Sequence, residues 1–410
     1  MCPSNEDSGV AMTNIFLSGP FDYKGKGWGY AHYSYGFAMD SFYETIKETE
    51  SIVATFSYPF NPRAARTSLM QYKDPVGISF LPPDVSLLVP RLKNICVFAW
   101  EFDKLPTKSK EVNGIFKKDY ASELKKYDSV ITLSSYSQKT LSDYGIASHV
   151  LPSAVSQKTV DAGEDINNLR CYNLSTTSNL YKDDPSVPLS SILDKSSYEN
   201  RFLYILNPHD IRKNFGNLVT AFVRFRESNP DAVLILKMTA KGELAKLQET
   251  AFRREFPSFQ ETNFENVYFI PERLSDSKLQ LLMNSCQNYI SPSRAEGQNL
   301  PLCEAMLSGM LCIAPDHTSM GDYVTSDSAI VLESNPWIID ETTHKYREFW
   351  GLSWYNVGEE TIFDALNKAS ALTSEEKNAI INKARQNVSD FCSPEAVLQK
   401  WQQIKLQLGI

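Results

Sequence analysis

The sequence has no apolar run long enough to cross a bilayer, and it has no cysteine pair at metal-ligand spacing. Its seven cysteines are scattered, so neither a zinc cluster nor a redox motif is indicated. Several lie in apolar runs, such as Cys96 and Cys312, which predicts reduced thiols in a protein core. The N-terminus has neither the basic nor the apolar region of a secretory signal. We therefore expect a cytoplasmic protein.

Positive charge is also scarce. The chain carries 41 Lys and Arg against 49 Asp and Glu, a formal net charge of −8, which argues against broad binding to nucleic acid or to an anionic membrane. A local basic cleft would still be compatible with this balance. With 42% hydrophobic and 12% aromatic residues the composition is that of a folded protein. The length of 410 residues predicts two or three domains.

Short apolar runs alternate with helical patterns in both halves of the chain. Buried strands that alternate with helices predict parallel sheets covered on both faces, and two such blocks predict two Rossmann-like domains. The expected strands are 14–18, 51–56, 95–100, 129–134, 148–153, 202–207, 232–238, 266–270, 288–293, 311–315 and 329–333. The expected helices are 32–48, 115–126, 136–144, 215–228, 242–253, 275–286, 300–309, 359–371, 374–389 and 394–408.

Residues 156–198 differ in character from both blocks. Asp, Asn, Ser and Pro dominate them and periodicity is absent, which predicts a linker or a surface insertion between a first domain, 1–155, and a second, 199–391. Open parallel sheets bind ligands beyond the carboxyl ends of their strands. We therefore expect the site in a cleft between the domains, built from residues that follow strands.

Two such segments lie in the first half. Glycines crowd the turn after the first strand, including Gly27 and Gly29, but their spacing is not that of a dinucleotide-binding fingerprint. Either a ligand-approaching loop or a plain flexible turn explains them. Glu101 and Asp103 follow the strand 95–100 directly. They would either bind substrate hydroxyls or cap the following segment.

The second half has two further segments of this kind. Arg212 and Lys213 precede the helix that begins near residue 215, where paired cations suit a diphosphate, unless they are simply solvated. In "SPSRAEGQNLPLCEAMLSG" (291–309), Glu296 lies in a turn and Glu304 lies about one turn inside the next helix. The backbone N–H groups between them would point toward an anion. The alternative is a solvated turn followed by an ordinary amphipathic helix.

Together these segments resemble a known family. "RKNFGNLVTAF", the run from "NVYFIPERLS" to "MLCIAP", and "GDYV" are similar to the retaining nucleotide-sugar glycosyltransferases of family 4. The resemblance is strong over roughly 200–325 and weaker before it. It implies an α/β protein with the GT-B fold, in which two Rossmann-like domains with parallel sheets face each other across a cleft. The last helix resembles the family's terminal helix, which assigns 392–410 to the first domain.

The resemblance also implies roles for individual residues. It assigns the donor ribose to Glu304, the transferred sugar to Glu296, and the diphosphate to Lys213 and Arg212. Where the family usually has an arginine, Asn207 stands here, and Arg212 would supply the missing charge. The other donor-side residues are Gly297, Gln298, Asn299, Leu300, Glu272, Arg273, Gly27 and Gly29, and the acceptor-side candidates are Glu101, Asp103 and Trp28. Polar Gln298 and Asn299 replace apolar family residues and would read sugar hydroxyls.

The implied reaction is retaining, metal-independent transfer of a sugar from a UDP- or GDP-linked donor, with no cofactor. By family frequency the acceptor is a polysaccharide or a lipid-linked oligosaccharide, so an association with the inner face of a membrane stays open. Three alternatives remain: a non-catalytic protein that binds sugar nucleotides or glycans, an epimerase or phosphorylase of the same fold, and an enzyme that glycosylates nucleic-acid bases. The sequence leaves the oligomeric state open.

Overall fold

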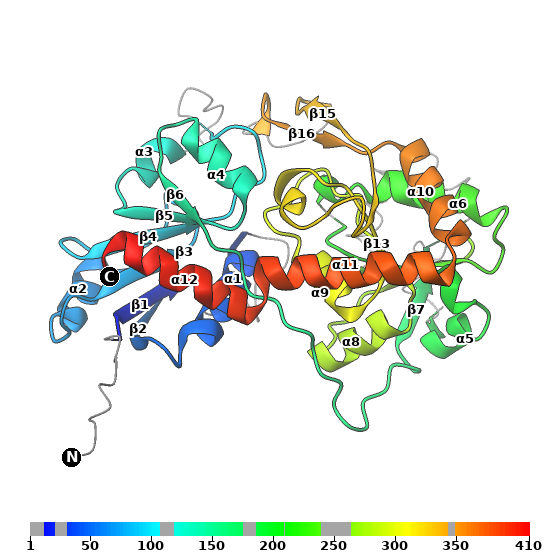
Figure 1. Ribbon diagram of the computed structural model, residues 1–410, viewed down its shortest axis with the longest axis horizontal. Helices are drawn as coiled ribbons and strands as arrows, with labels where there is room; N and C mark the ends of the chain where they lie inside the picture. Colours follow the sequence, from blue (N-terminus) through cyan, green and yellow to red (C-terminus); the bar gives the residue numbers. More distant parts are fainter. Residues whose placement is uncertain are drawn as a thin grey trace, which may run out of the picture.

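The computed structural model describes residues 12–20, 31–106, 119–174, 186–208, 210–238, 264–342 and 349–410. Within these residues two sheets form two domains that lie side by side (Figure 1). We call the part built on the sheet of the first half the first domain, and the part built on the other sheet the second domain. The α/β fold expected from the alternation of strands and helices is confirmed.

The first domain contains a sheet of six described strands, all parallel, in the order β2-β1-β3-β4-β5-β6. Its strands are β1 (Asn14–Gly19), β2 (Ser51–Ser57), β3 (Val76–Phe80), β4 (Lys93–Phe98), β5 (Ser129–Thr132) and β6 (Ser148–Val150). Its helices are α1 (Ala31–Ile46), α2 (Pro62–Leu69), α3 (Tyr120–Leu124) and α4 (Ser135–Ser142). The central strands are fully buried, as continuous apolar runs in a covered parallel sheet should be.

The sheet of the second domain has eight described strands in the order β14-β13-β12-β9-β10-β11-β7-β8. The six strands from β9 to β14 pair in parallel, as expected. They are β9 (Arg201–Leu206), β10 (Val233–Met238), β11 (Val267–Ile270), β12 (Asn288–Ile290), β13 (Leu311–Ala314) and β14 (Ile330–Val331). The α-helices here are α5 (Leu189–Leu193), α6 (Phe215–Arg226), α8 (Asp276–Asn284), α9 (Leu300–Ser308), α10 (Glu359–Ala371) and α11 (Ser374–Cys392).

The segment 156–198 is not simply a linker, which corrects the interpretation of its composition. Within it β7 (Arg170–Asn173) and β8 (Val187–Pro188) extend the second sheet by antiparallel pairing, and α5 follows them. These strands are too short for an apolar period, yet Cys171 and Leu189 are fully buried. Only the part before β7 connects the two sheets as a linker. The other domain bounds stay a prediction.

Two elements of the first domain escaped prediction, α2 and β3. The strand β3 contains Gly77, and glycine weakens a strand assignment. The structure gives its reason: a Cβ atom on Gly77 would lie 2.2 Å from Cζ of Phe16 in the neighbouring strand. Gly77 therefore makes room for a buried aromatic ring. The predicted helix 242–253 and the first part, 115–118, of the predicted helix 115–126 lie outside the described residues.

The final helix α12 (Pro394–Leu408) leaves α11 and packs on the first domain, as Figure 1 shows in red. Its Lys405 forms a 2.6 Å ion pair with Glu50, which is 1% exposed and also accepts a bond from the Trp401 indole. The Trp401 ring meets Phe42 edge to face at 5.1 Å. One buried cluster thus anchors the C-terminus to the domain in which the chain begins.

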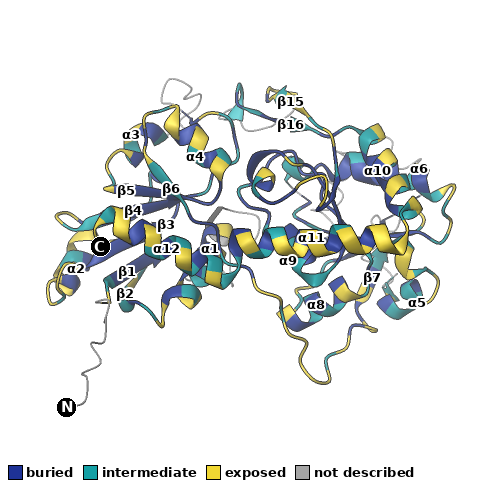
Figure 2. Ribbon diagram, viewed as in Figure 1, coloured by how far each residue is buried: buried dark blue, intermediate teal, exposed yellow. Residues whose placement is uncertain are grey.

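A second contact between the domains was not predicted. The antiparallel hairpin of β15 (Asn335–Ile338) and β16 (Ser353–Asn356) extends from the second domain toward α3 and α4 (Figure 1). Its Trp354, Leu352 and Ile339 are buried in one cluster with Trp100 and Phe102 of the first domain. The neighbouring Phe349 stacks on Phe102 at 5.0 Å. In Figure 2 the hairpin is exposed along much of β15 and more buried along β16.

The described cysteines lie in the protein core, as expected. Cys96, Cys171, Cys286, Cys303, Cys312 and Cys392 are buried and unpaired. In the described part of the chain, no helix combines the length and the apolar character that a membrane span needs.

Candidate active site

The predicted basic pair and the predicted carboxylate meet at one edge of the second sheet. Arg212 and Lys213 lie in the short 3-10 helix η4 (Ile211–Lys213), just beyond β9, and Glu296 lies in the loop between β12 and α9. Because β9 and β12 are parallel neighbours, their carboxyl ends lie together. The bond from the Arg294 N–H to the Arg212 carbonyl, 2.8 Å, fixes the two loops to each other.

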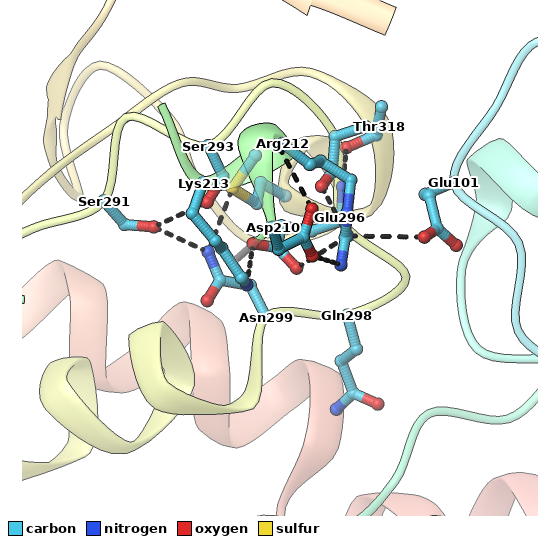
Figure 3. Close-up of polar contacts among 12 residues, drawn as sticks. Glu101, Asp210, Arg212, Lys213, Ser291, Ser293, Glu296, Gln298, Asn299 and Thr318 are labelled. Carbon is cyan, nitrogen blue, oxygen red and sulfur yellow. Dashed lines mark hydrogen bonds and ion pairs between the residues drawn. The ribbon is translucent and has the colours of Figure 1, made fainter. Parts of the chain in front are cut away.

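Glu296 is the centre of this cluster (Figure 3). One carboxylate oxygen accepts a 2.6 Å bond from Lys213 Nζ, and the other accepts a 3.2 Å bond from Arg212. Glu296 is only 5% exposed, so these charge-assisted bonds lie where water competes weakly. Its own N–H donates to Thr318 Oγ1 over 3.1 Å. The carboxylate is therefore held on both sides in one orientation.

Arg212 connects Glu296 to two further carboxylates. It donates to Asp210 at 2.9 Å and forms a 3.4 Å ion pair with Glu101, which follows β4 in the first domain. A third bond, 2.7 Å, goes to the Ala295 carbonyl. Glu101 follows a strand of the first domain, as predicted from the sequence, and reaches the site across the domain boundary.

The pKa values follow from burial and these cations. For Glu296, burial acts to raise the pKa, but Lys213 and Arg212 outweigh it and hold the pKa below its ordinary value. The same balance lowers the pKa of Asp210. For Glu101 burial prevails, and the pKa is raised despite the nearby Arg212. Glu296 and Asp210 are therefore ionised at neutral pH, whereas Glu101 is the carboxylate of the cluster that most readily takes up a proton.

The helices α6 and α9 begin at this cluster in an unusual way. Both N-cap residues, Asn214 and Asn299, have left-handed backbones with φ of 52° and 64°, and neither makes a side-chain cap bond. At α9 the first-turn N–H groups are therefore left without the usual side-chain acceptor. Together with the positive end of the helix dipole they favour an anion. This agrees with the anion site expected at the start of α9.

The loop after β13 contacts the segment that carries Glu296 and holds it in place. Thr318 has a φ of 52°, which is rare for a β-branched residue and costs on the order of 1–3 kcal/mol. Next to it, His317 donates from Nε2 to the Ser293 carbonyl at 3.0 Å and accepts at Nδ1 from Ser334 at 2.7 Å. Burial lowers the pKa of His317 to about 4, so its imidazole stays neutral and braces the segment that carries Glu296.

Glu304 lies one turn into α9, away from the Glu296 cluster. Its Oε1 pairs with Lys158 Nζ at 2.8 Å, and Lys158 also contacts Asp276 at 3.1 Å. Burial raises the pKa of Glu304, while Lys158 acts against that rise. The two predicted glutamates therefore flank the start of α9, each with its own cation.

The side chains of two residues expected to bind sugar hydroxyls form hydrogen bonds with other protein groups in this structure. The Gln298 amide accepts from the Ser153 N–H and donates to the Ser153 carbonyl, both at 2.8 Å, and so links the two domains. The Asn299 amide donates to Ser291 Oγ at 3.0 Å inside the second domain. Both side chains are buried. The polar character of this loop serves its anchoring, which corrects the sequence interpretation.

Other predicted residues fall nearby or outside the described chain. Asp103 accepts from the Ser353 N–H of β16, so it holds the hairpin to the first domain rather than facing an acceptor. Gly297 lies against the first domain, since a Cβ atom on it would be 3.6 Å from Cβ of Ala99. Leu300 begins α9, and Glu272 and Arg273 follow β11. The predicted Gly27, Trp28 and Gly29 lie outside the described residues.

Four residues of the site were not predicted: Asp210, Lys158, His317 and Thr318. Of these, His317 and Thr318 closely follow β13. The expectation that site residues follow the ends of strands, which identified Glu101, therefore also applied to them. Asp210 is two residues before Arg212. No local pattern distinguishes Lys158, because its partner Glu304 is far away in the sequence.

Comparison with known proteins agrees with this geometry. Residues 195–345 match the model of a family described as glycosyl transferases group 1, and they include Arg212, Lys213, Glu296 and Glu304. A search of curated protein sequences finds no match.

Solved structures identify the fold. Sucrose-phosphate synthase from Thermosynechococcus elongatus matches with a TM-score of 0.60 and 12% identity over 97% of this chain and 99% of that chain. A UDP-forming α,α-trehalose-phosphate synthase from Burkholderia vietnamiensis matches with 0.61 and 11%, over 97% of each. S. aureus TarM, a variant in complex with fondaparinux, α-GlcNAc-glycerol and UDP, matches with 0.53 and 13% over 82% of this chain, which spans only 57% of TarM. The fold is GT-B.

Proposed function

We propose that the protein is a retaining glycosyltransferase that moves a sugar from a nucleotide-diphosphate donor to a saccharide or a lipid-linked glycan. The observation that carries this proposal is the Glu296 carboxylate, fixed by Lys213 and Arg212 beside the uncapped start of α9. It lies in the region that matches the family of glycosyl transferases. A buried carboxylate beside paired cations and an anion site suits a sugar diphosphate.

In this proposal the donor spans the start of α9. Lys213, Arg212 and the helix N–H groups bind the diphosphate, Glu296 contacts the transferred sugar, and Glu304 accepts bonds from the ribose hydroxyls. The segment with Glu272 and Arg273 meets the base. Arg212 already contacts three carboxylates, so the entering diphosphate replaces its contacts with Glu101 or Asp210.

The reaction follows from this arrangement. The bond between the sugar and the diphosphate breaks first, and negative charge grows on the leaving phosphate next to two fixed cations and a helix start. The acceptor hydroxyl attacks the same face of the oxocarbenium-like sugar, and the departing phosphate takes its proton. Because Lys213 and Arg212 neutralise the leaving group, we expect no metal requirement, which an EDTA-treated assay tests. Among the described residues no three acidic, His or Cys side chains are placed to hold a metal ion.

The proposed donor is UDP- or GDP-linked. Two solved structures with this fold, S. aureus TarM and the pneumococcal O-GlcNAc transferase GtfA, are described as complexes with UDP. They support UDP as the first probe. We place the reaction in the cytoplasm, which the buried free thiols support, with lipid-linked acceptors at the membrane's inner face.

A thermal-shift screen of UDP- and GDP-sugars tests the proposal, since a ligand that binds the folded state alone raises the unfolding temperature. We expect stabilisation by one nucleotide series, followed by slow hydrolysis of the matching sugar donor. Absence of a shift with every nucleotide and nucleotide sugar would contradict the proposal. Binding without hydrolysis or transfer to any glycan acceptor would favour a non-catalytic sugar-nucleotide-binding protein.

A further inference from the structure

The connection between the two sheets passes close to the proposed nucleotide site. From residue 156 the chain runs without regular structure beside the starts of α8 and α9. The Asp161 N–H donates to Ser277 Oγ at 2.9 Å, and Lys278 lies 3.9 Å from Glu164. These contacts fix the linker on the second domain. They also bring Lys158 to Glu304.

The contact between Lys158 and Glu304 is the strongest of these. The Nζ–Oε1 distance is 2.8 Å, and the two side chains are 21% and 19% exposed. The second partner of Lys158, Asp276, is 82% exposed, so water screens its attraction. Lys158 therefore acts mainly on Glu304. Among the described residues it is the cation in contact with that carboxylate.

Glu304 needs this partner. Burial raises its pKa, and Lys158 is the first of the influences that lower it. A protonated carboxyl group would have one oxygen that donates instead of accepting. An ionised carboxylate has about four acceptor positions, so one bond from Lys158 leaves room for two ribose hydroxyls.

We propose that Lys158 is a positioning residue for the donor ribose: from the linker, its ion pair with Glu304 fixes the orientation in which both ribose hydroxyls donate to that carboxylate. This inference rests on the proposed function of Glu304. The bond to the ribose is made in the bound donor and in the transition state alike, so Lys158 governs donor binding rather than the chemical step.

The test measures binding of UDP and of 2′,3′-dideoxy-UDP by calorimetry, with GDP and its dideoxy form as the purine pair. The main variant is Lys158→Met, which keeps most of the side-chain stem and removes the charge. We expect it to bind UDP about ten-fold more weakly, in line with the loss of one charge-supported hydrogen-bond arrangement. Its affinity for the dideoxy nucleotide should equal that of the wild type. The donor KM should rise while kcat stays near the wild-type value.

Matched variants separate this role from a structural one. Lys158→Arg should restore most of the affinity, because it keeps the cation. Lys278→Met makes the same substitution beside the linker without touching Glu304, and Ser277→Ala removes the linker's bond to α8. Both should bind like the wild type. In a Glu304→Gln background, Lys158→Met should have no further effect, since coupled residues are not additive.

The possible outcomes distinguish a failure of this inference from a failure of the proposed function. If Lys158→Met leaves UDP binding unchanged, or weakens UDP and dideoxy-UDP equally, the inference is wrong although the proposed function stands. The same holds if Ser277→Ala reproduces the loss. If the wild type itself binds both members of each pair equally, the ribose role of Glu304 fails, and with it this inference. If it binds neither UDP nor GDP, the proposed function fails as well.

Discussion

At the scale of the residue, the site consists of a few oppositely charged side chains that water reaches poorly. Lys213 and Arg212 hold Glu296 in one orientation, and Arg212 also reaches Asp210 and Glu101. The sequence predicted the basic pair and Glu296 because each follows a strand end. It did not predict that Arg212 would contact three carboxylates, since the contact with Glu101 spans a separation of more than a hundred residues.

Lys213 is the residue whose loss should affect catalysis most directly. Lys213→Ala removes a cation from the proposed diphosphate site and the partner of one Glu296 oxygen, and transfer should fall about 10²-fold or more. Initial rates at saturating donor measure this, with Lys213→Arg as the control that keeps the charge. Turnover near the wild-type rate in the alanine variant would contradict the role.

His317 should make the protein less stable in mild acid. Its pKa is about 4 when folded and 6.5 as the ordinary value, so the unfolded chain takes up a proton first. The contribution of the neutral His317 side chain to the free energy of unfolding is therefore fully present above pH 6.5. It is lost as the pH falls toward 4, by about 3 kcal/mol in all. His317→Gln keeps a donor for the Ser293 carbonyl. Urea unfolding at several pH values should show a shallower acid slope in this variant; equal slopes would contradict the prediction.

At the scale of the element, helix and strand positions were largely predictable, and for α10 and α12 both ends were predicted as well. Helices such as α11 carry their own signals: Thr373 and Glu376 form a capping box, and the apolar period is long. The strands β7 and β8 carry none, because four and two residues cannot establish a period. Pairing of β7 with β11, and of β8 with β7, makes them strands in the finished sheet.

The docking of α12 should depend on a buried ion pair. Lys405→Met leaves the Glu50 carboxylate buried without its cation, and we expect a loss of about 3–5 kcal/mol in unfolding free energy. The double variant Glu50→Gln, Lys405→Met removes both charges and should recover part of that loss. Urea unfolding of both variants and of Glu50→Gln completes the cycle. A double variant less stable than Lys405→Met would show that no unpaired charge causes the loss.

At the scale of the whole molecule, several sets of contacts hold the two domains together. α12 packs on the first domain, Gln298 bonds to Ser153, and the hairpin β15–β16 packs its aromatic side chains on Phe102. The hairpin lies outside the region, roughly 200–325, in which the sequence most strongly resembles the glycosyltransferases. It packs on Phe102, the residue that follows Glu101, and Glu101 in turn pairs with Arg212.

Phe102→Ala should loosen this arrangement. The substitution removes a ring that stacks on Phe349 and packs against Trp354, so the hairpin loses its hold on the first domain. We expect a larger radius of gyration by small-angle scattering and slower transfer. Donor affinity should change little, because Lys213, Glu296 and Glu304 all belong to the second domain. Tyr58→Ala, at an exposed ring of the first domain, is the control. Unchanged scattering and transfer in Phe102→Ala would contradict the role.

The sequence by itself determined the α/β class, the strand-end positions of Glu101, Arg212, Lys213 and Glu296, and the place where α9 begins. These follow from local periodicity and from turn and helix-start chemistry, which act between near neighbours. Only the tertiary structure decided which charged side chains lie close enough to shift one another's pKa. It also decided that Gln298 joins the domains and that Lys158 contacts Glu304. Those facts depend on distances between residues far apart in the chain, and no local pattern contains them.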